Sequence, residues 1–188
     1  QISYLPLAMA IGSPAALVGL ILQLISHAMT KSLLYMTAGG IDWKTGNVNV
    51  TRFNGLYKIM PITCGVFLVA ACSMIGLPPT SGFFAKWYLL TGSLSGHQLL
   101  FAIVLVISSL LNAIYFLRLL ERFFFRTGID DKIDIQIVRF SVRELPLSML
   151  VPMITMAILI VIVGLGSGYL VDFALQYISP LILGGGGL

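Results

Sequence analysis

The chain of 188 residues is 58% hydrophobic and only 10% charged, with a mean hydropathy of +1.00. A soluble domain carries about 25% charged residues, so this composition excludes an ordinary soluble protein and indicates an α-helical membrane bundle. The net charge of +4 does not indicate nucleic-acid binding, because the basic residues between Arg122 and Arg143 are mixed with acids and form no basic helix interleaved with aromatic residues.

Six apolar segments follow one another in a single membrane domain over residues 1–188. None has the ten-residue alternation of a transmembrane barrel strand. The first segment is too short to span alone and is predicted to be the remnant of a helix, whereas the second is long enough to span with tilt. The predicted boundaries are 2–12 for the remnant and 14–41, 61–77, 83–94, 99–125 and 145–178 for the transmembrane segments.

Two polar connections carry most of the basic residues. The Asp42–Lys58 loop holds three, and the Arg118–Glu144 region holds six. If three spans separate the two connections, they lie on opposite faces of the membrane. The excess of Lys and Arg then predicts that the Arg118–Glu144 connection is cytoplasmic. Cysteines placed at Asn47 and Asp131 would test this orientation.

A break precedes a lysine in the middle of the chain. The sequence from Gly76 to Gly82 contains two glycines and two prolines, which cannot continue a regular helix, and Lys86 lies four residues further on. A broken helix at membrane depth is tolerated where it lines a wet cavity or is buried in protein, and the freed backbone groups there would solvate a charge. The alternative is an ordinary turn with Lys86 snorkelling to the membrane surface.

A polar stripe runs along the segment 14–41. Gln23, His27 and Lys31 recur at four-residue steps and therefore lie on one drifting helical face, with Ser26 and Thr30 alongside. Histidine exchanges protons near pH 7, and burial brings lysine toward that range, so the stripe is predicted to accept, hold and release protons. The alternative is that these side chains only hydrogen-bond helices together.

No other reaction chemistry stands out, and no cofactor is predicted. Cys64 and Cys72 are about 12 Å apart along one helix and cannot bridge each other, so they are interpreted as packing residues. The sequence has no Cys/His metal spacing, no phosphate-binding loop and no motif for a flavin or an iron–sulfur cluster. Tyr35, Trp87 and Tyr88 are expected in packing or at the membrane interface.

Three stretches together resemble the proton-pumping antiporter-like subunits of respiratory complex I, Mrp-type cation/proton antiporters and membrane-bound hydrogenases. They are "QISYLPLAMAIGSP", "LISHAMTKSLLYMTAGGI" and "MPITCGVFLVAACSMIGLPPTSGFFAKWYLL". The H-x-x-x-K element and the G-x-P-P-x-x-G-F-x-x-K element are specific in this order and spacing. The resemblance covers nearly the whole chain and is closest to the D-type member of the Mrp antiporters and its hydrogenase relatives.

This resemblance implies a fold of fourteen core helices containing two inverted five-helix repeats, of which the chain would match the ninth to the fourteenth. His27 and Lys31 would be the histidine and lysine of the tenth helix. Lys86 would be the lysine of the broken twelfth helix, where the second half-channel exits. The family's glutamate–lysine pair on the fifth and seventh helices and its lysine on the eighth have no positions here, and the lateral helix after the last span is also absent.

The leading hypothesis is therefore the C-terminal part of an antiporter-like proton channel, relaying protons through Lys31, His27, Lys86 and Gln23 among the other membrane subunits of a redox or cation/proton antiporter complex in a bacterial or archaeal cell membrane. We expect it to be a fragment or a split subunit completed by a polypeptide that supplies the first helices. Protons are its expected cargo, and sodium is a candidate coupled ion. One rival is a quinone-reactive subunit using His27 and Tyr35. Another is an inert structural scaffold.

Overall fold

The computed structural model describes residues 1–46, 55–125, 144–173 and 176. These residues form helices and no strand, which agrees with the predicted all-α class. In chain order the elements are α1 (Tyr4–Ile11), α2 (Pro14–Thr45), the short 3-10 helix η2 (Leu56–Lys58), α3 (Pro61–Ile75), α4 (Ser81–Ser95), α5 (Leu99–Phe124), α7 (Leu147–Leu165) and α8 (Ser167–Phe173).

Three of the described helices, α2, α5 and α7, are long and apolar enough to cross a membrane. Large apolar side chains on α5 and α7 are exposed, with Leu100 at 71% and Leu147 at 75%. Such continuous apolar exposure is unfavourable in water and favourable in lipid. The helices therefore present to the bilayer the surface that the composition predicts.

Local sequence sets both ends of α2. Ser13 precedes the helix in an extended conformation and its side chain accepts a hydrogen bond from Ala16 N at 3.2 Å, while Pro14 occupies the first turn. Gly46 ends the helix in the left-handed conformation, with φ at 63°. The helix thus continues through Asp42 to Thr45, beyond the predicted transmembrane segment 14–41.

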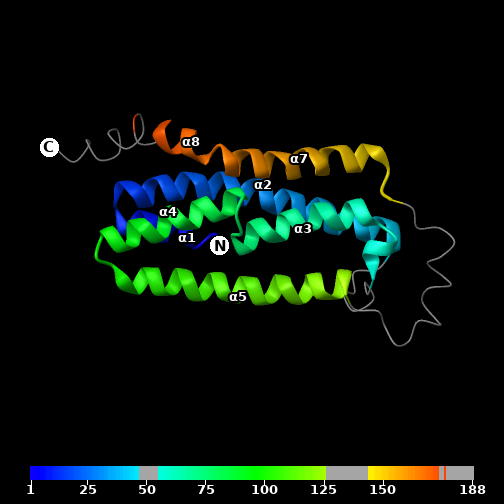
Figure 1. Cartoon of the computed structure of the whole chain (residues 1–188), viewed down its shortest axis with the longest axis horizontal. Helices are drawn as coiled ribbons and strands as arrows, with labels where there is room; N and C mark the ends of the chain where they lie inside the picture. Colours follow the sequence, from blue (N-terminus) through cyan, green and yellow to red (C-terminus); the bar gives the residue numbers. More distant parts are fainter. Residues whose placement is uncertain (47–54, 126–143, 174–175, 177–188) are drawn as a thin grey trace.

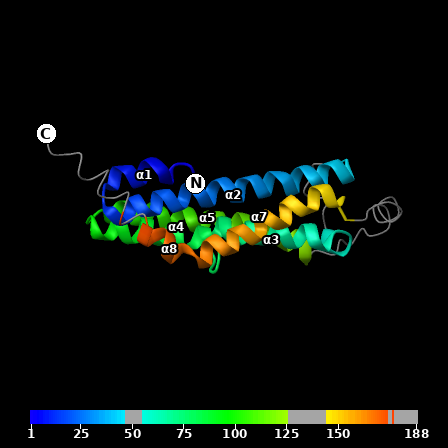
Figure 2. The same ribbon diagram turned by 90° about the horizontal axis from the view of Figure 1, so that it is seen from above.

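The helices α3 and α4 run end to end through the middle of the bundle (Figures 1 and 2). Each has 15 residues. That gives a length of about 22 Å, which is short of the roughly 30 Å of a bilayer's hydrocarbon core. Together they run alongside α2, which has 32 residues. The two segments counted separately in the sequence are thus the two halves of one broken crossing.

This arrangement overturns the predicted placement of the two polar connections on opposite faces. Two crossings separate them, α3 with α4 and then α5, so the ends that flank them meet at one end of the bundle. The Gly55 N–H donates to Arg122 O at 3.2 Å, and the rings of Tyr57 and Phe124 stack at 5.8 Å. The test positions Asn47 and Asp131 lie outside the described residues.

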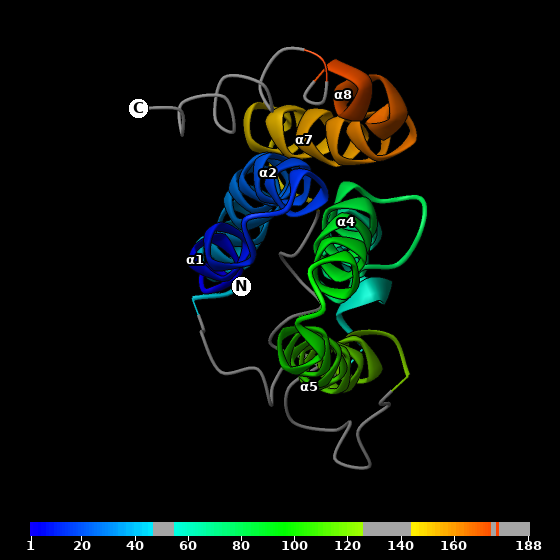
Figure 3. The same ribbon diagram turned by 90° about the vertical axis from the view of Figure 1, so that its left-hand side faces the viewer.

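The last predicted segment, 145–178, is divided. α7 ends at Leu165, Gly166 follows, and α8 resumes from Ser167 to Phe173. Figure 3 looks along the bundle: α7 lies on one side of α2 and α4, α5 lies on the opposite side, and α1 lies beside α2. The main core between α2, α3, α5 and α7 is apolar and includes Leu33, Met60, Phe67, Phe123 and Met153.

Candidate functional site

The side chain of Lys86 reaches back from α4 to the end of α3. Its Nζ donates hydrogen bonds to Met74 O at 2.8 Å and to Ile75 O at 2.9 Å. The last carbonyls of a helix have no partner within the helix and carry its negative dipole end. The break in the crossing therefore supplies what an ammonium group needs inside a membrane. Lys86 does not follow the snorkelling geometry, because its nitrogen bonds within the bundle.

Gly76 makes room for this contact. It ends α3 in the left-handed region with φ at 90°, and a Cβ atom there would lie 3.0 Å from Lys86 Cδ. A residue with a side chain would meet both the backbone strain and the lysine. The Gln1 side chain also donates to Met74 O, through Nε2 at 2.8 Å. One carbonyl thus receives hydrogen bonds from α4 and from the residue that leads into α1.

Two hydrogen-bonded pairs of hydroxyl groups connect α2 to the residues on either side of the break. Ser81 Oγ donates to Ser26 Oγ at 3.0 Å, and Thr30 Oγ1 and Ser73 Oγ lie 2.8 Å apart. All four residues are buried. Sequence reasoning placed Ser26 and Thr30 beside the polar stripe but missed Ser73 and Ser81. The available signal was that small polar residues lie just before the Gly/Pro interruption and within it.

Glycines let the backbone pack tightly around the break. A Cβ atom on Gly82, in the first turn of α4, would lie 2.0 Å from Ser73 O. A Cβ atom on Gly164 of α7 would lie 2.1 Å from Pro79 O. Real Cβ contacts are never this short, so α3, α4 and α7 approach one another closely because these positions lack side chains.

The predicted stripe on α2 is divided between two environments. Gln23 is buried, with 2% of its surface exposed, whereas His27 and Lys31 are half-buried. His27 Nδ1 is enclosed and has no hydrogen-bond partner among the described residues. The buried polar face of α2 is formed instead by Gln23, Ser26, Thr30 and Thr37.

Lys31 has no hydrogen-bonding or acidic partner among the described residues. Its Nζ lies 5.8 Å from the centre of the Tyr35 ring, a cation–π distance, and Tyr35 is itself 71% exposed. The structure brings Lys86 into direct contact with neither His27 nor Lys31.

In the part of the chain that the structure describes, no three His, Cys, Asp or Glu side chains lie close enough together to hold a metal ion. Cys64 and Cys72 are free thiols there, as their spacing predicted. Trp87 is 54% exposed on α4. The quinone-reactive interpretation of His27 and Tyr35 stays a prediction.

Comparisons with known proteins match both the sequence and the fold. Over 96% of its length the chain is 42% identical to NADH-quinone oxidoreductase subunit N of Desulforudis audaxviator, of which it covers 37%. It is 31% identical, over 92% of its length, to a Na(+)/H(+) antiporter subunit of Alkalihalophilus pseudofirmus and covers 23% of it. The chain thus spans about a third or less of the curated relatives it matches.

Among solved structures, a chain of the Mrp complex from Dietzia superposes with a TM-score of 0.79 at 25% identity, over 93% of this chain and 39% of that one. A chain of respiratory complex I from Thermus thermophilus superposes with a TM-score of 0.78 at 21% identity and supports the fold alone. These relatives are subunits of multi-subunit membrane complexes. Residues 1–112 match the family model "NADH:quinone oxidoreductase/Mrp antiporter, TM". The chain is an integral membrane protein that belongs to this family of antiporter-like subunits.

Proposed function

We propose that the chain forms the C-terminal, proton-translocating part of an antiporter-like subunit, and that Lys86 at the broken crossing is its central relay group. The observation that carries this proposal is the pair of hydrogen bonds from Lys86 Nζ to Met74 O and Ile75 O. A lysine that only anchored the chain at the membrane surface would have no need of a broken helix.

The hydrogen-bond inventory of Lys86 supports a relay. A lysine ammonium group has three donors, and two are used by the carbonyls of Met74 and Ile75. The third proton can leave while a neutral amine keeps both carbonyl contacts. Lys86 can therefore change charge without releasing its hold on α3. An arginine could occupy the same carbonyls but would stay charged under all ordinary conditions.

Lys31 and His27 support a second part of the path. An enclosed imidazole nitrogen and a half-buried ammonium group without partners among the described residues are unfavourable unless something else meets them. We infer that they exchange protons with water or with side chains of a polypeptide that completes the subunit, with Gln23 as a neighbouring hydrogen-bonding group. Protons are the proposed cargo, and sodium is a second candidate ion.

Lys86 variants test the relay in the complete membrane complex. Lys86→Arg should keep the carbonyl contacts and assembly but lose proton pumping about tenfold or more, because the guanidinium group does not release a proton. Lys86→Ala should lose pumping as well. Pumping is measured with a pH-sensitive dye in inverted membrane vesicles, and assembly by the amount of complex recovered.

Lys58→Arg is the matched control, because Lys58 is an exposed cation on η2 and contacts only the Tyr57 ring among the described residues. It should pump normally. Full pumping by Lys86→Arg in a complex that assembles at the normal level would remove Lys86 from the proton path and leave it a structural cap of α3.

A further inference from the structure

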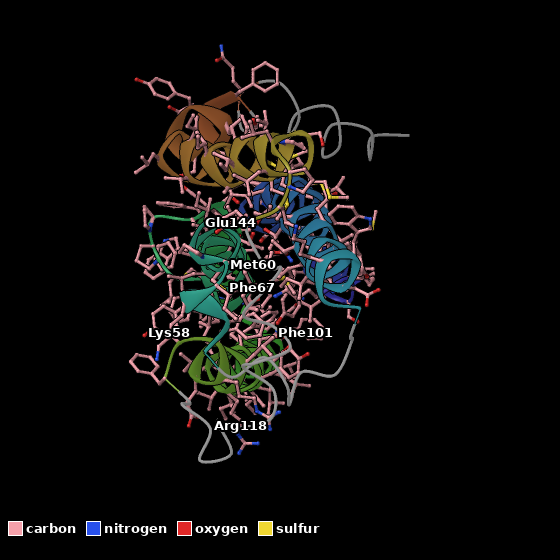
Figure 4. All side chains as sticks on the ribbon, turned by 90° about the vertical axis from the view of Figure 1, so that its right-hand side faces the viewer. Lys58, Met60, Phe67, Phe101, Arg118 and Glu144 are labelled. Atoms are coloured by element: carbon pink, nitrogen blue, oxygen red, sulfur yellow. The ribbon has the colours of Figure 1, made fainter. Side chains whose placement is uncertain are left out.

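The N-terminal end of α3 also carries a charged side chain from another part of the chain. Glu144, just before α7, accepts a hydrogen bond from Ile62 N at 2.5 Å through Oε1 and one from Thr63 Oγ1 at 2.8 Å through Oε2. Figure 4, which faces this end of the bundle, labels Glu144 near Met60, the residue before α3. Thr63 is completely buried, and Glu144 is half-buried.

The Glu144 carboxylate caps the N-terminus of α3, which the residues next to that terminus do not do. Met60 precedes the helix and offers no side-chain cap, and Pro61 has no N–H to offer. The first free N–H groups of a helix need an acceptor and favour a negative charge. Glu144 supplies both from 82 residues further along the chain.

The two ends of α3 are thus held in opposite ways by other elements. A carboxylate sits on its N-terminal N–H groups, and the Lys86 ammonium group sits on its C-terminal carbonyls. Both charges match the helix dipole. The helix between them is regular and about 22 Å long, and most of its surface is buried in the core.

We propose that Glu144 is a positioning residue for Lys86, acting through α3. By fixing the first turn of α3, Glu144 fixes where the carbonyls of Met74 and Ile75 lie, and hence where Lys86 can bind. A helix moves as a unit when one of its ends is released. Loss of the Glu144 contacts should therefore also shift the carbonyls of Met74 and Ile75 at the break. The consequence for transport rests on the proposed function of Lys86, whereas the mechanical coupling does not.

Two native cysteines report on the two ends of α3. Cys64 lies in the first turn beside Glu144, and Cys72 lies in the last turn, where its carbonyl accepts from Gly76 N at 2.9 Å. Each is studied alone, in Cys64→Ala or Cys72→Ala backgrounds of the complete complex. The rate of labelling by a membrane-permeant maleimide measures how often each end of the helix opens.

Glu144→Ala should raise the labelling rate of Cys72 about fivefold, the factor expected when one buried hydrogen bond is lost, and that of Cys64 at least as much. Glu144→Gln should give a smaller rise at both cysteines, because an amide oxygen still accepts from Ile62 N. Glu121→Ala is the control. Glu121 is exposed on α5 at the same end, and its side chain bonds to no described residue.

Coupling is then tested with Lys86→Ala. This variant should speed Cys72 labelling, and combined with Glu144→Ala it should give less than the product of the two single effects. Faster labelling confined to Cys64, or an effect on Cys72 that is the simple product, would overturn the positioning role. Pumping is followed in parallel. Normal pumping in Lys86→Arg with coupled labelling would refute the relay and leave the positioning intact.

Discussion

Lys86 and Lys31 are the same residue type in two different settings. Lys86 donates to two helix-end carbonyls, whereas Lys31 meets only an aromatic ring among the described residues. A charge inside a membrane is costly, about 2.5–3.5 kcal/mol on insertion scales, so each lysine needs compensation. Lys86 obtains it within this chain. Lys31, half-buried on α2, contacts only the Tyr35 ring among the described residues, and the proposed function assigns its compensation to water or to another polypeptide.

Lys31→Ala is therefore expected to leave assembly intact and to lower proton-linked activity about tenfold or more, because it removes a proton-exchanging group while breaking no hydrogen bond of the described structure. Proton pumping in membrane vesicles is the measurement, and Lys44→Ala, a cation in the last turn of α2, is the comparison. Normal pumping without Lys31 would make the stripe a helix-packing feature.

At the residue scale, the sequence points to the candidate titratable residues but not to the groups that they contact. A lysine in an apolar stretch stands out, as Lys86 did after the Gly/Pro interruption. Backbone carbonyls are present at every position and leave no sequence signature, so Met74 and Ile75 gave no signal. The role of Glu144 was hidden for a related reason, since its contacts lie 81 and 82 residues away.

At the scale of the helices, the break depends on close backbone approach. α3 and α4 meet where Gly82 passes Ser73, and α7 covers the turn with Gly164 against Pro79. These contacts place the first turn of α4 beside the last turn of α3, which lets Lys86 reach backwards. The position of Lys86 is thus set by glycines that carry no chemistry themselves.

Gly82→Ala should displace the start of α4, because its Cβ would lie 2.0 Å from Ser73 O, and should destabilise the protein by about 1–3 kcal/mol. Gly65→Ala in α3 is the matched control: its Cβ would have nothing within 4 Å, and alanine is the better helix former. Thermal stability of the purified complex and Cys72 labelling are measured for both. Equal stability of the two variants would show that the close approach is adjustable.

The presence of each helix could be predicted from the length of its apolar segment, but the way in which two helices share one crossing could not. The segments 61–77 and 83–94 each looked like a span because their apolar residues are continuous. Whether two short helices cross a membrane separately or in series depends on the direction the chain takes at the break, and that direction is set by packing against α2 and α7. The error carried over to the orientation of the polar connections.

At the scale of the whole molecule, the corrected topology places the basic connections at the same end of the bundle. Every Lys and Arg other than Lys31 and Lys86 lies in or beside the two connections that the sequence places at 42–58 and 118–144. The helix ends that flank these connections meet at one end of the bundle (Figure 1). Among the described basic residues there, Lys58 and Arg118 are labelled in Figure 4. The turns at the opposite end, Gly12–Ser13 and Gly96–Gln98, carry neither Lys nor Arg.

The positive-inside rule then predicts that the basic end faces the cytoplasm and the α4–α5 turn faces outward. With Cys64 and Cys72 replaced, an impermeant maleimide added to intact cells should label Ser95→Cys, at the end of α4, and spare Asp42→Cys, at the end of α2. Both positions are exposed, so permeabilised cells should show both labelled. Labelling of Asp42→Cys alone in intact cells would reverse the orientation.

The divided crossing also affects how the chain enters the membrane during synthesis. Neither 15-residue half reaches across the hydrocarbon core, and the second half carries a lysine, so neither would leave the translocon for lipid readily on its own. The earlier part of the chain meets this need. α2 emerges from the ribosome first and already holds Ser26 and Thr30, the partners of both halves. When α3 and α4 follow, they can pack against α2. Insertion of this crossing then depends on contacts with α2 as well as on the transfer of apolar residues from water to lipid.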